Sequence, residues 1–165
     1  MLSKKIEKGL NEQIGLEAYS SSYYMAIATW CAANGYNGIA KYLYHHSDEE
    51  REHMLKIYSY MNEAGAQAIT PKIDKPPAEQ KSVRAGIQAA LKHEMKVTAS
   101  INSLADVSMK EKDYTTFNFL QWFIKEQLEE ENQFRSILSK IDLVGTDSKG
   151  LYMIDKEMGK KVDNS

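Results

Sequence analysis

The chain contains few cysteine, proline and glycine residues and no long apolar run. Its one cysteine, Cys31, excludes an intrachain disulfide and fits a reducing cytoplasm. Only 3 prolines and 9 glycines in 165 residues argue against a disordered, collagen-like or turn-rich all-β protein. No run approaches the roughly 20 apolar residues of a membrane span, and the first residues contain no apolar signal segment. A net charge of −2 without a basic block argues against nucleic acid as a partner. We therefore expect a cytoplasmic protein without a nucleic-acid or membrane partner.

Apolar residues recur every three or four positions through most of the chain, which predicts long amphipathic helices. Ser3, Ser82 and Asp113 precede three of these segments and can cap them, whereas Gly35, after Asn34, and Gly65 can end two of them. The expected helices lie at about 4–33, 37–64, 82–110 and 113–144, with a short last helix at about 148–158.

The segment 66–81 contains Pro71, Pro76 and Pro77 and has no periodicity, so we expect a connection rather than a helix. A helix of about 28 residues is about 42 Å long, and a connection of about 16 residues reaches at most about 55 Å. The connection can therefore cross the length of a bundle, while the other helix pairs have short turns. The sequence predicts one all-α domain over 1–165, a four-helix bundle with one long crossover and a short C-terminal helix.

On each long helix, the residues spaced three or four apart form a stripe that we expect to face the core. Each stripe is apolar at its ends and carries a carboxylate near its middle. An unpaired buried charge costs several kcal/mol even after relaxation. Four carboxylates at one height cannot neutralise one another, so either they are protonated or a multivalent cation lies among them, and we favour the cation. The polar positions are Glu17, Glu50 with His53, Glu94, and Gln127 with Glu130.

The spacing of these residues predicts a two-metal site. Glu50 and His53 are three residues apart, so both can reach one point beside their helix. Di-iron carboxylate bundles use one Glu from each of two helices and a Glu-x-x-His motif from each of the others. The first half of the chain follows this pattern with Glu17, Glu50 and His53. The second half departs from it, with Gln127 and Glu130 where Glu and His are expected.

Two segments resemble a known family. Residues 47–53, Ser-Asp-Glu-Glu-Arg-Glu-His, are similar to the second-helix signature of ferritins. Residues 119–127, Phe-Leu-Gln-Trp-Phe-Ile-Lys-Glu-Gln, resemble the fourth-helix motif of the non-haem bacterial ferritins. The resemblance covers about residues 1 to 160, including the segment 151–156. It implies an iron-storage ferroxidase that oxidises Fe(II) with O₂ or H₂O₂ and forms a 24-mer shell around ferric mineral.

The resemblance also implies roles for single residues. Glu17, Glu50 and His53 would hold one iron, with Glu50 as the bridge. Glu94 and Glu130, with Glu50 and nearby Gln127, would hold the second. A third iron site toward the cavity would take Glu49, Glu126 and Glu129 together with Glu130, and Tyr24 and Trp122 would stand beside the iron pair.

Other interpretations remain open from the sequence. Haem-carrying bacterioferritins have methionine where this chain has Arg51, so haem is not expected. A symmetric di-iron peroxidase or oxygenase, a catalytically silent storage subunit and a purely structural bundle are the alternatives. We expect His45, His46 and His93 at the surface or the edge of the core rather than as ligands.

Overall fold

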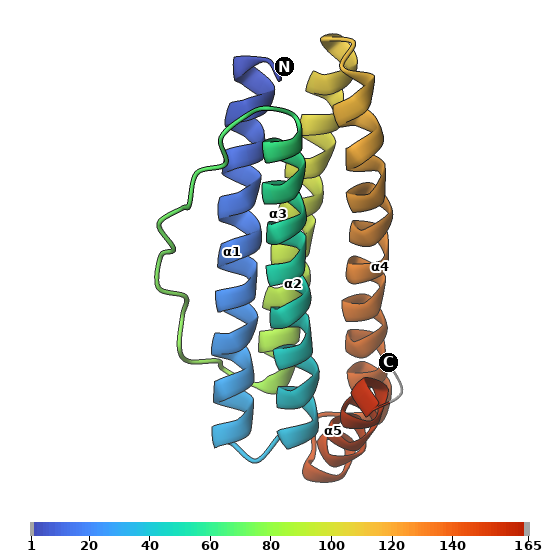
Figure 1. Cartoon of the computed structure of the whole chain (residues 1–165). Coiled ribbons are helices and arrows are strands. Elements are labelled where there is room, and N and C mark those ends of the chain that lie inside the picture. The colour runs from blue at the N-terminus through green and yellow to red at the C-terminus, as the bar shows by residue number, and fades with distance from the viewer. Residues whose placement is uncertain (1, 164–165) are drawn as a thin grey trace.

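The computed structural model describes residues 2–163 and contains five α-helices in that range. Four long helices form a bundle, and a fifth packs across one end of it (Figure 1). The expected fold class is confirmed. The helices are α1 Lys4–Ala33, α2 Asn37–Glu63, α3 Val83–Lys110, α4 Tyr114–Val144 and α5 Ser148–Asp163. Among the described residues no helix is long and apolar enough to cross a membrane.

Side-chain caps begin three of the long helices. The Ser3 hydroxyl accepts the backbone N–H of Ile6 at 3.2 Å, and the Ser82 hydroxyl accepts that of Ala85 at 3.1 Å. The Asp113 carboxylate does the same for Thr116 at 3.0 Å. These bonds satisfy N–H groups that have no partner inside the helix. The three caps that the sequence predicts are therefore present.

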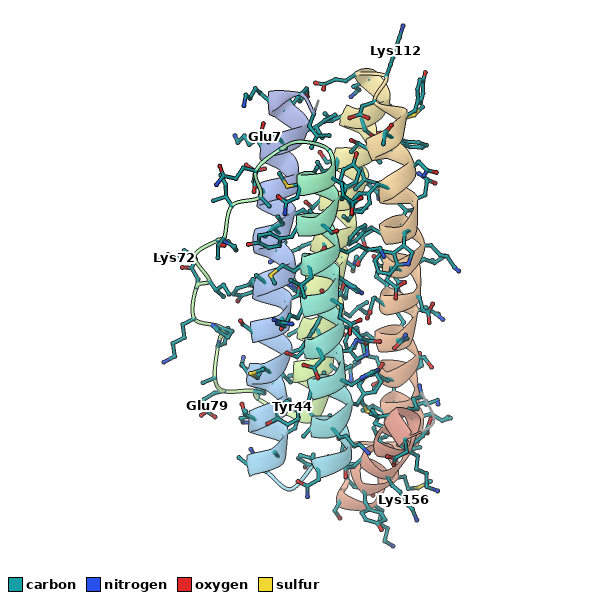
Figure 2. The ribbon with its side chains drawn as sticks, viewed as in Figure 1. Glu7, Tyr44, Lys72, Glu79, Lys112 and Lys156 are labelled. Atoms are coloured by element: carbon teal, nitrogen blue, oxygen red, sulfur yellow. The ribbon has the colours of Figure 1, made fainter. Side chains whose placement is uncertain are left out.

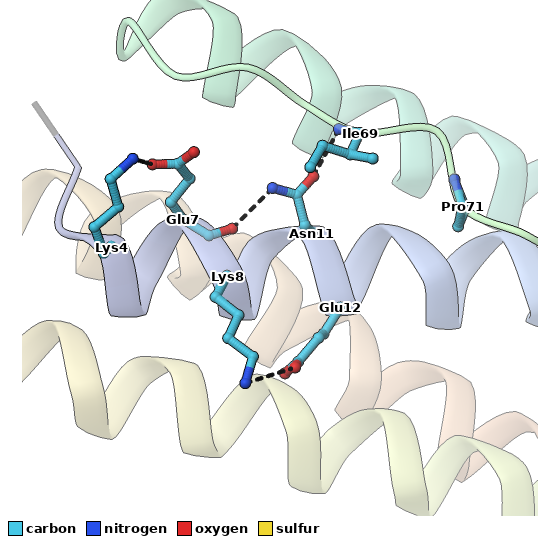
Figure 3. Close-up of a pocket in the computed structure, with 7 residues that line it drawn as sticks. All are labelled: Lys4, Glu7, Lys8, Asn11, Glu12, Ile69 and Pro71. Carbon is cyan, nitrogen blue, oxygen red and sulfur yellow. Dashed lines mark hydrogen bonds and ion pairs between the residues drawn. The ribbon is translucent and has the colours of Figure 1, made fainter.

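The crossover runs along the outside of the bundle from the end of α2 to the start of α3 (Figure 1). It is tied to α1, because the Asn11 side chain accepts the backbone N–H of Ile69 at 2.7 Å and donates to the Glu7 carbonyl at 3.0 Å (Figure 3). Lys72 and Glu79 of the crossover point away from the helices (Figure 2). This path makes α2 and α3 run parallel (Figure 1).

The core consists of two apolar clusters. One surrounds Tyr24, Leu43 and Phe134, and the other surrounds Ile14 and Phe123. A polar layer separates the clusters, because each long helix carries buried polar residues between its two apolar stretches. Packing of the two clusters therefore fixes the height and the depth of that layer.

Helix α5 is longer than expected and packs closely on α2. It continues to Asp163, because Val162 packs against the same apolar cluster as the buried Ile154 and Met158. The backbones meet where Gly38 faces Asp155 and Gly159, and the Asp155 carboxylate accepts the backbone N–H of Ile39 at 2.8 Å. A side chain on Gly38 would overlap the Asp155 carbonyl group.

This contact predicts that Gly38→Ala displaces α5. Overpacking of this kind costs about 1–3 kcal/mol, so we expect a lower unfolding temperature and faster protease cleavage within α5. Gly15→Ala is the matched control, because its new Cβ meets only Pro71 at 3.7 Å and alanine favours a helix by about 0.5–1 kcal/mol. Equal behaviour of the two variants would contradict this packing.

Candidate metal centre

Six polar side chains from the four long helices lie in the layer between the apolar clusters. Every one is at most 5% exposed. The carboxylates come from all four helices, and His53 stands one turn after Glu50 on α2. The structure thus brings together the residues that the stripes predict: Glu17, Glu50, His53, Glu94, Gln127 and Glu130.

Glu17, Glu50 and His53 form the most deeply buried group. One ligand atom from each lies within 4.8 Å of the others, and His53 Nδ1 is 3.6 Å from Glu50 Oε2. Among the described residues, Glu17 Oε2, both Glu50 oxygens and His53 Nδ1 have no hydrogen-bond partner. A buried acceptor without a partner costs about 1–3 kcal/mol, and more when it is charged. Oxygen and imidazole donors converging in this way fit a transition-metal ion.

Glu94 is held by two neighbours instead. The Gln127 amide donates to Glu94 Oε2 at 2.8 Å, and the Tyr24 hydroxyl donates to Glu94 Oε1. Gln127 therefore contacts the centre through Glu94, with its amide nitrogen turned toward that carboxylate. Tyr24 is fully buried beside the centre, and the ring of Trp122 packs edge-on against His53 with centroids 5.2 Å apart.

The residues expected for a third site do not form one cluster. Glu126 groups with His53 and Glu130, while Glu49 groups with His46 and Glu130. Glu129 belongs to neither group and lines a cavity of about 290 Å³ together with Glu49. Glu130 is common to both groups, so it links the buried centre to the side of the bundle between α2 and α4.

Comparison with known proteins decides the family. The model of the ferritin-like domain matches residues 7–144. A bacterial non-heme ferritin of Escherichia coli is 41% identical over 158 residues, which cover 96% of each chain. A probable bacterial non-heme ferritin-like protein of Haemophilus influenzae is 45% identical with the same coverage. An open-pore ferritin of the archaeon Archaeoglobus fulgidus superposes with a TM-score of 0.94 at 34% identity, over 96% of this chain and 98% of that one.

The chain belongs to the ferritin family. This confirms the family that the two sequence segments indicate. The match extends over nearly the full chain, so it includes all four helices that supply the buried polar layer.

Burial shifts the protonation of the ferritin carboxylates. It raises the pKa of Glu50 well above its usual range, and the charges of Glu94 and Glu17 raise it further. Burial also raises the pKa of Glu17, and together with the charge of Glu130 it raises the pKa of Glu94 to about 7. The raised pKa values favour the protonated carboxyl groups, so binding of a cation is expected to release protons.

Two residues near the centre were missed by sequence reasoning. Gln13 is fully buried, and its amide donates to Glu17 Oε1 at 2.7 Å while its oxygen accepts the Ser100 hydroxyl at 2.6 Å. Its position one turn before Glu17 on the same stripe is a signal that could have found it. His46 is 1% exposed, so the expectation that it lies at the surface or core edge is wrong; His93, at 8%, is buried also.

The raised pKa values predict how metal-free ferritin responds to pH. Between about 4.5, the ordinary value, and 7, Glu94 binds more protons in the folded chain than in the unfolded one. Stability contributed by this group is therefore present at low pH and lost as the pH rises through 7. We expect a lower unfolding temperature at pH 8 than at pH 6, and a smaller difference when Zn(II) is bound. A metal-free protein that is more stable at pH 8 would contradict these shifts.

Proposed function

We propose that this ferritin stores iron, and that it oxidises Fe(II) at a di-iron centre inside each subunit and deposits ferric mineral in a hollow shell. One observation carries the proposal: Glu17, Glu50 and His53 aim unpartnered buried atoms at one another in the middle of an apolar bundle. Membership of the ferritin family supports the same function.

Two ions divide the donors between them. Glu17, Glu50 and His53 hold the first ion, and Glu94 and Glu130 hold the second. Glu50 bridges, because both of its oxygens lack another partner and because the charges of Glu94 and Glu17 both act on it and raise its pKa. Gln13 positions Glu17, since its amide occupies the other oxygen of that carboxylate. Gln127 lies next to the second ion through its bond to Glu94.

Iron is the substrate of this centre. Two Fe(II) ions each give one electron, and the pair of electrons with two protons reduces O₂ to H₂O₂, or H₂O₂ to two waters. Carboxylate ligands stabilise the ferric product, because their charge and hard oxygen atoms suit Fe(III). The Tyr24 hydroxyl stays protonated, since burial and Glu94 raise its pKa well above the ordinary value. Tyr24 thereby holds Glu94 in place during the reaction.

Gln127 makes the centre asymmetric. It stands where the symmetric pattern has a Glu, so the second ion lacks one negative ligand and one possible bridge. We infer that this ion is held less tightly and leaves after oxidation. Iron therefore binds at the centre, is oxidised there and leaves. Glu49, Glu126 and Glu129 then pass it toward the mineral.

The assembly and location follow from the same proposal. A 24-mer shell supplies the mineral cavity, and the relatives named ferritin support such an oligomer. Arg51 takes the place of the haem-binding methionine, so no haem is included. We assign the protein to the cytoplasm, in keeping with its single cysteine.

Removing a ligand of the first ion tests the centre. We expect Glu50→Ala or His53→Ala to slow Fe(II) oxidation at least tenfold, measured as the formation of ferric absorbance after mixing with oxygen, while gel filtration still gives the full shell. Glu52→Ala on the exposed side of α2 is the control and should oxidise iron at the original rate. Unchanged rates in both ligand variants would refute the assignment.

Restoring the missing charge tests the asymmetry. Gln127→Glu supplies another carboxylate to the second ion, so we expect tighter Fe(II) binding in anaerobic titration. Product should also leave more slowly, so that the rate of repeated turnovers falls relative to the first. The ratio of the later turnover rates to the first should therefore be lower in the variant than in the original protein. An equal ratio would contradict the proposal that iron leaves the centre after oxidation.

A further inference from the structure

Gln13 is a fully buried amide on α1 that contacts the proposed centre through Glu17. Its nitrogen donates to Glu17 Oε1 at 2.7 Å, and its oxygen accepts the hydroxyl of Ser100 on α3 at 2.6 Å. Glu17 Oε2, in contrast, has no hydrogen-bond partner among the described residues. The three side chains thus form a link from α3 to one oxygen of a carboxylate that the proposed iron pair uses.

The chemistry of the three side chains sets the direction of these hydrogen bonds. An ionised carboxylate only accepts hydrogen bonds, so the Gln13 nitrogen faces Glu17 and the Gln13 oxygen faces α3. That oxygen is buried, and a buried acceptor needs a donor. Within the described part of the chain, the Ser100 hydroxyl is the donor that it has. A side chain without a donor at position 100 would leave the Gln13 oxygen unsatisfied.

The packing of α1 on α3 brings Ser100 to Gln13. Three contacts between the two helices share one antiparallel register, and the pairs are Gly9 with Leu104, Gln13 with Ser100, and Ser20 with His93. Each step forward along α1 is matched by an equal step back along α3. Because Gly9 has no side chain, Leu104 packs directly on α1, and a Cβ on Gly9 would lie 2.5 Å from Leu104 Cδ2. This close approach lets the short Ser100 side chain reach Gln13.

We propose that Ser100 and Gln13 are positioning residues for Glu17, and that they hold it with Oε2 alone toward the first ion. Ser100 fixes the oxygen end of the Gln13 amide, and the nitrogen end of that amide occupies Glu17 Oε1. Neither residue is itself a ligand. The inference rests on the proposed function, because it requires the first ion at Glu17, Glu50 and His53.

A carboxylate that is held in advance binds an ion more tightly than one that must be ordered on binding. Partners that orient a metal ligand typically change the metal affinity about 10–100-fold. Ser100 is one hydrogen bond further from the ion than Gln13, so the loss of its hydroxyl should have the smaller effect. Such a loss should weaken binding of the first ion without changing the oxidation of iron that is already bound.

Two variants of nearly equal shape test the hydroxyl. Ser100→Thr keeps the donor, whereas Ser100→Val replaces it with a methyl group. Ser100 is half-buried at a surface cavity of about 260 Å³, and the larger valine side chain keeps water from taking the place of the hydroxyl. Ser103→Val, one turn further along α3 at an exposed position, controls for the effect of valine on the helix.

Zinc(II) serves as the probe, because it is not oxidised. We would measure the zinc affinity of the assembled, metal-free protein by competition with a chelator, and locate the ions by anomalous diffraction at the zinc edge. Zinc should lie about 2.0–2.2 Å from Glu17 Oε2 and should not bind Oε1. We expect Ser100→Val to weaken this ion about three- to tenfold, and we expect Ser100→Thr and Ser103→Val to bind it as the original protein does.

Two further measurements distinguish positioning from a general loss of stability. Ser100→Val should cause no additional weakening in a Gln13→Leu background, because Ser100 acts through Gln13. In Fe(II) oxidation, Ser100→Val should raise the Fe(II) concentration that gives half the maximal rate. The maximal rate should stay within about twofold of the original, because the ligands of the bound ions are unchanged.

The outcomes separate this inference from the proposed function. Equal zinc affinities of the valine and threonine variants at position 100, or an additional loss in the Gln13→Leu background, would overturn the role of Ser100. An equal loss in Ser103→Val, or zinc bound through Glu17 Oε1, would overturn it as well. Absence of zinc at Glu17, Glu50 and His53 in the original protein would instead contradict the proposed function.

Discussion

Like charges buried together in an apolar bundle are the constraint on which this structure depends. Four carboxylates share one layer of the core, and each uncompensated charge costs several kcal/mol. A domain of this size is stable by only about 5–15 kcal/mol in total. The chain can carry the layer because apolar clusters above and below it fold around the polar residues, and because protons or metal ions neutralise them. Without metal, the raised pKa values of Glu50 and Glu94 favour their protonated forms, which lowers the buried charge.

Neutral donors around the layer decide which carboxylate oxygens remain free to bind a metal ion. Gln13 binds one oxygen of Glu17, and Tyr24 and Gln127 bind the two oxygens of Glu94. Glu50 receives no such bond among the described residues, so both of its oxygens remain free. The hydrogen bonds thus leave Glu50 free while they orient its neighbours. Most of these donors lie one helical turn away from, or directly across from, the carboxylate that they hold.

Much of this architecture could be predicted from the sequence. The helical period gave the four long helices and the position of the buried carboxylates, because one stripe of each helix must face the core. Caps at Ser3, Ser82 and Asp113 depend only on local geometry, so they too were predictable. The close contact of Gly38 with α5 was not, because it depends on how two helices cross. The burial of His46 and the placement of Glu49 and Glu126 in different groups likewise depend on distances between helices. The spacing of apolar residues along one helix does not determine those distances.

We propose that the buried carboxylates serve to bind metal ions. The most direct test is diffraction at the iron edge from crystals of the metal-free protein soaked anaerobically in Fe(II). We expect two iron ions in the layer, one bound by Glu17, Glu50 and His53 and one by Glu94 and Glu130, with Glu50 between them. A layer without iron, or carboxylates that turn toward solvent instead, would contradict it.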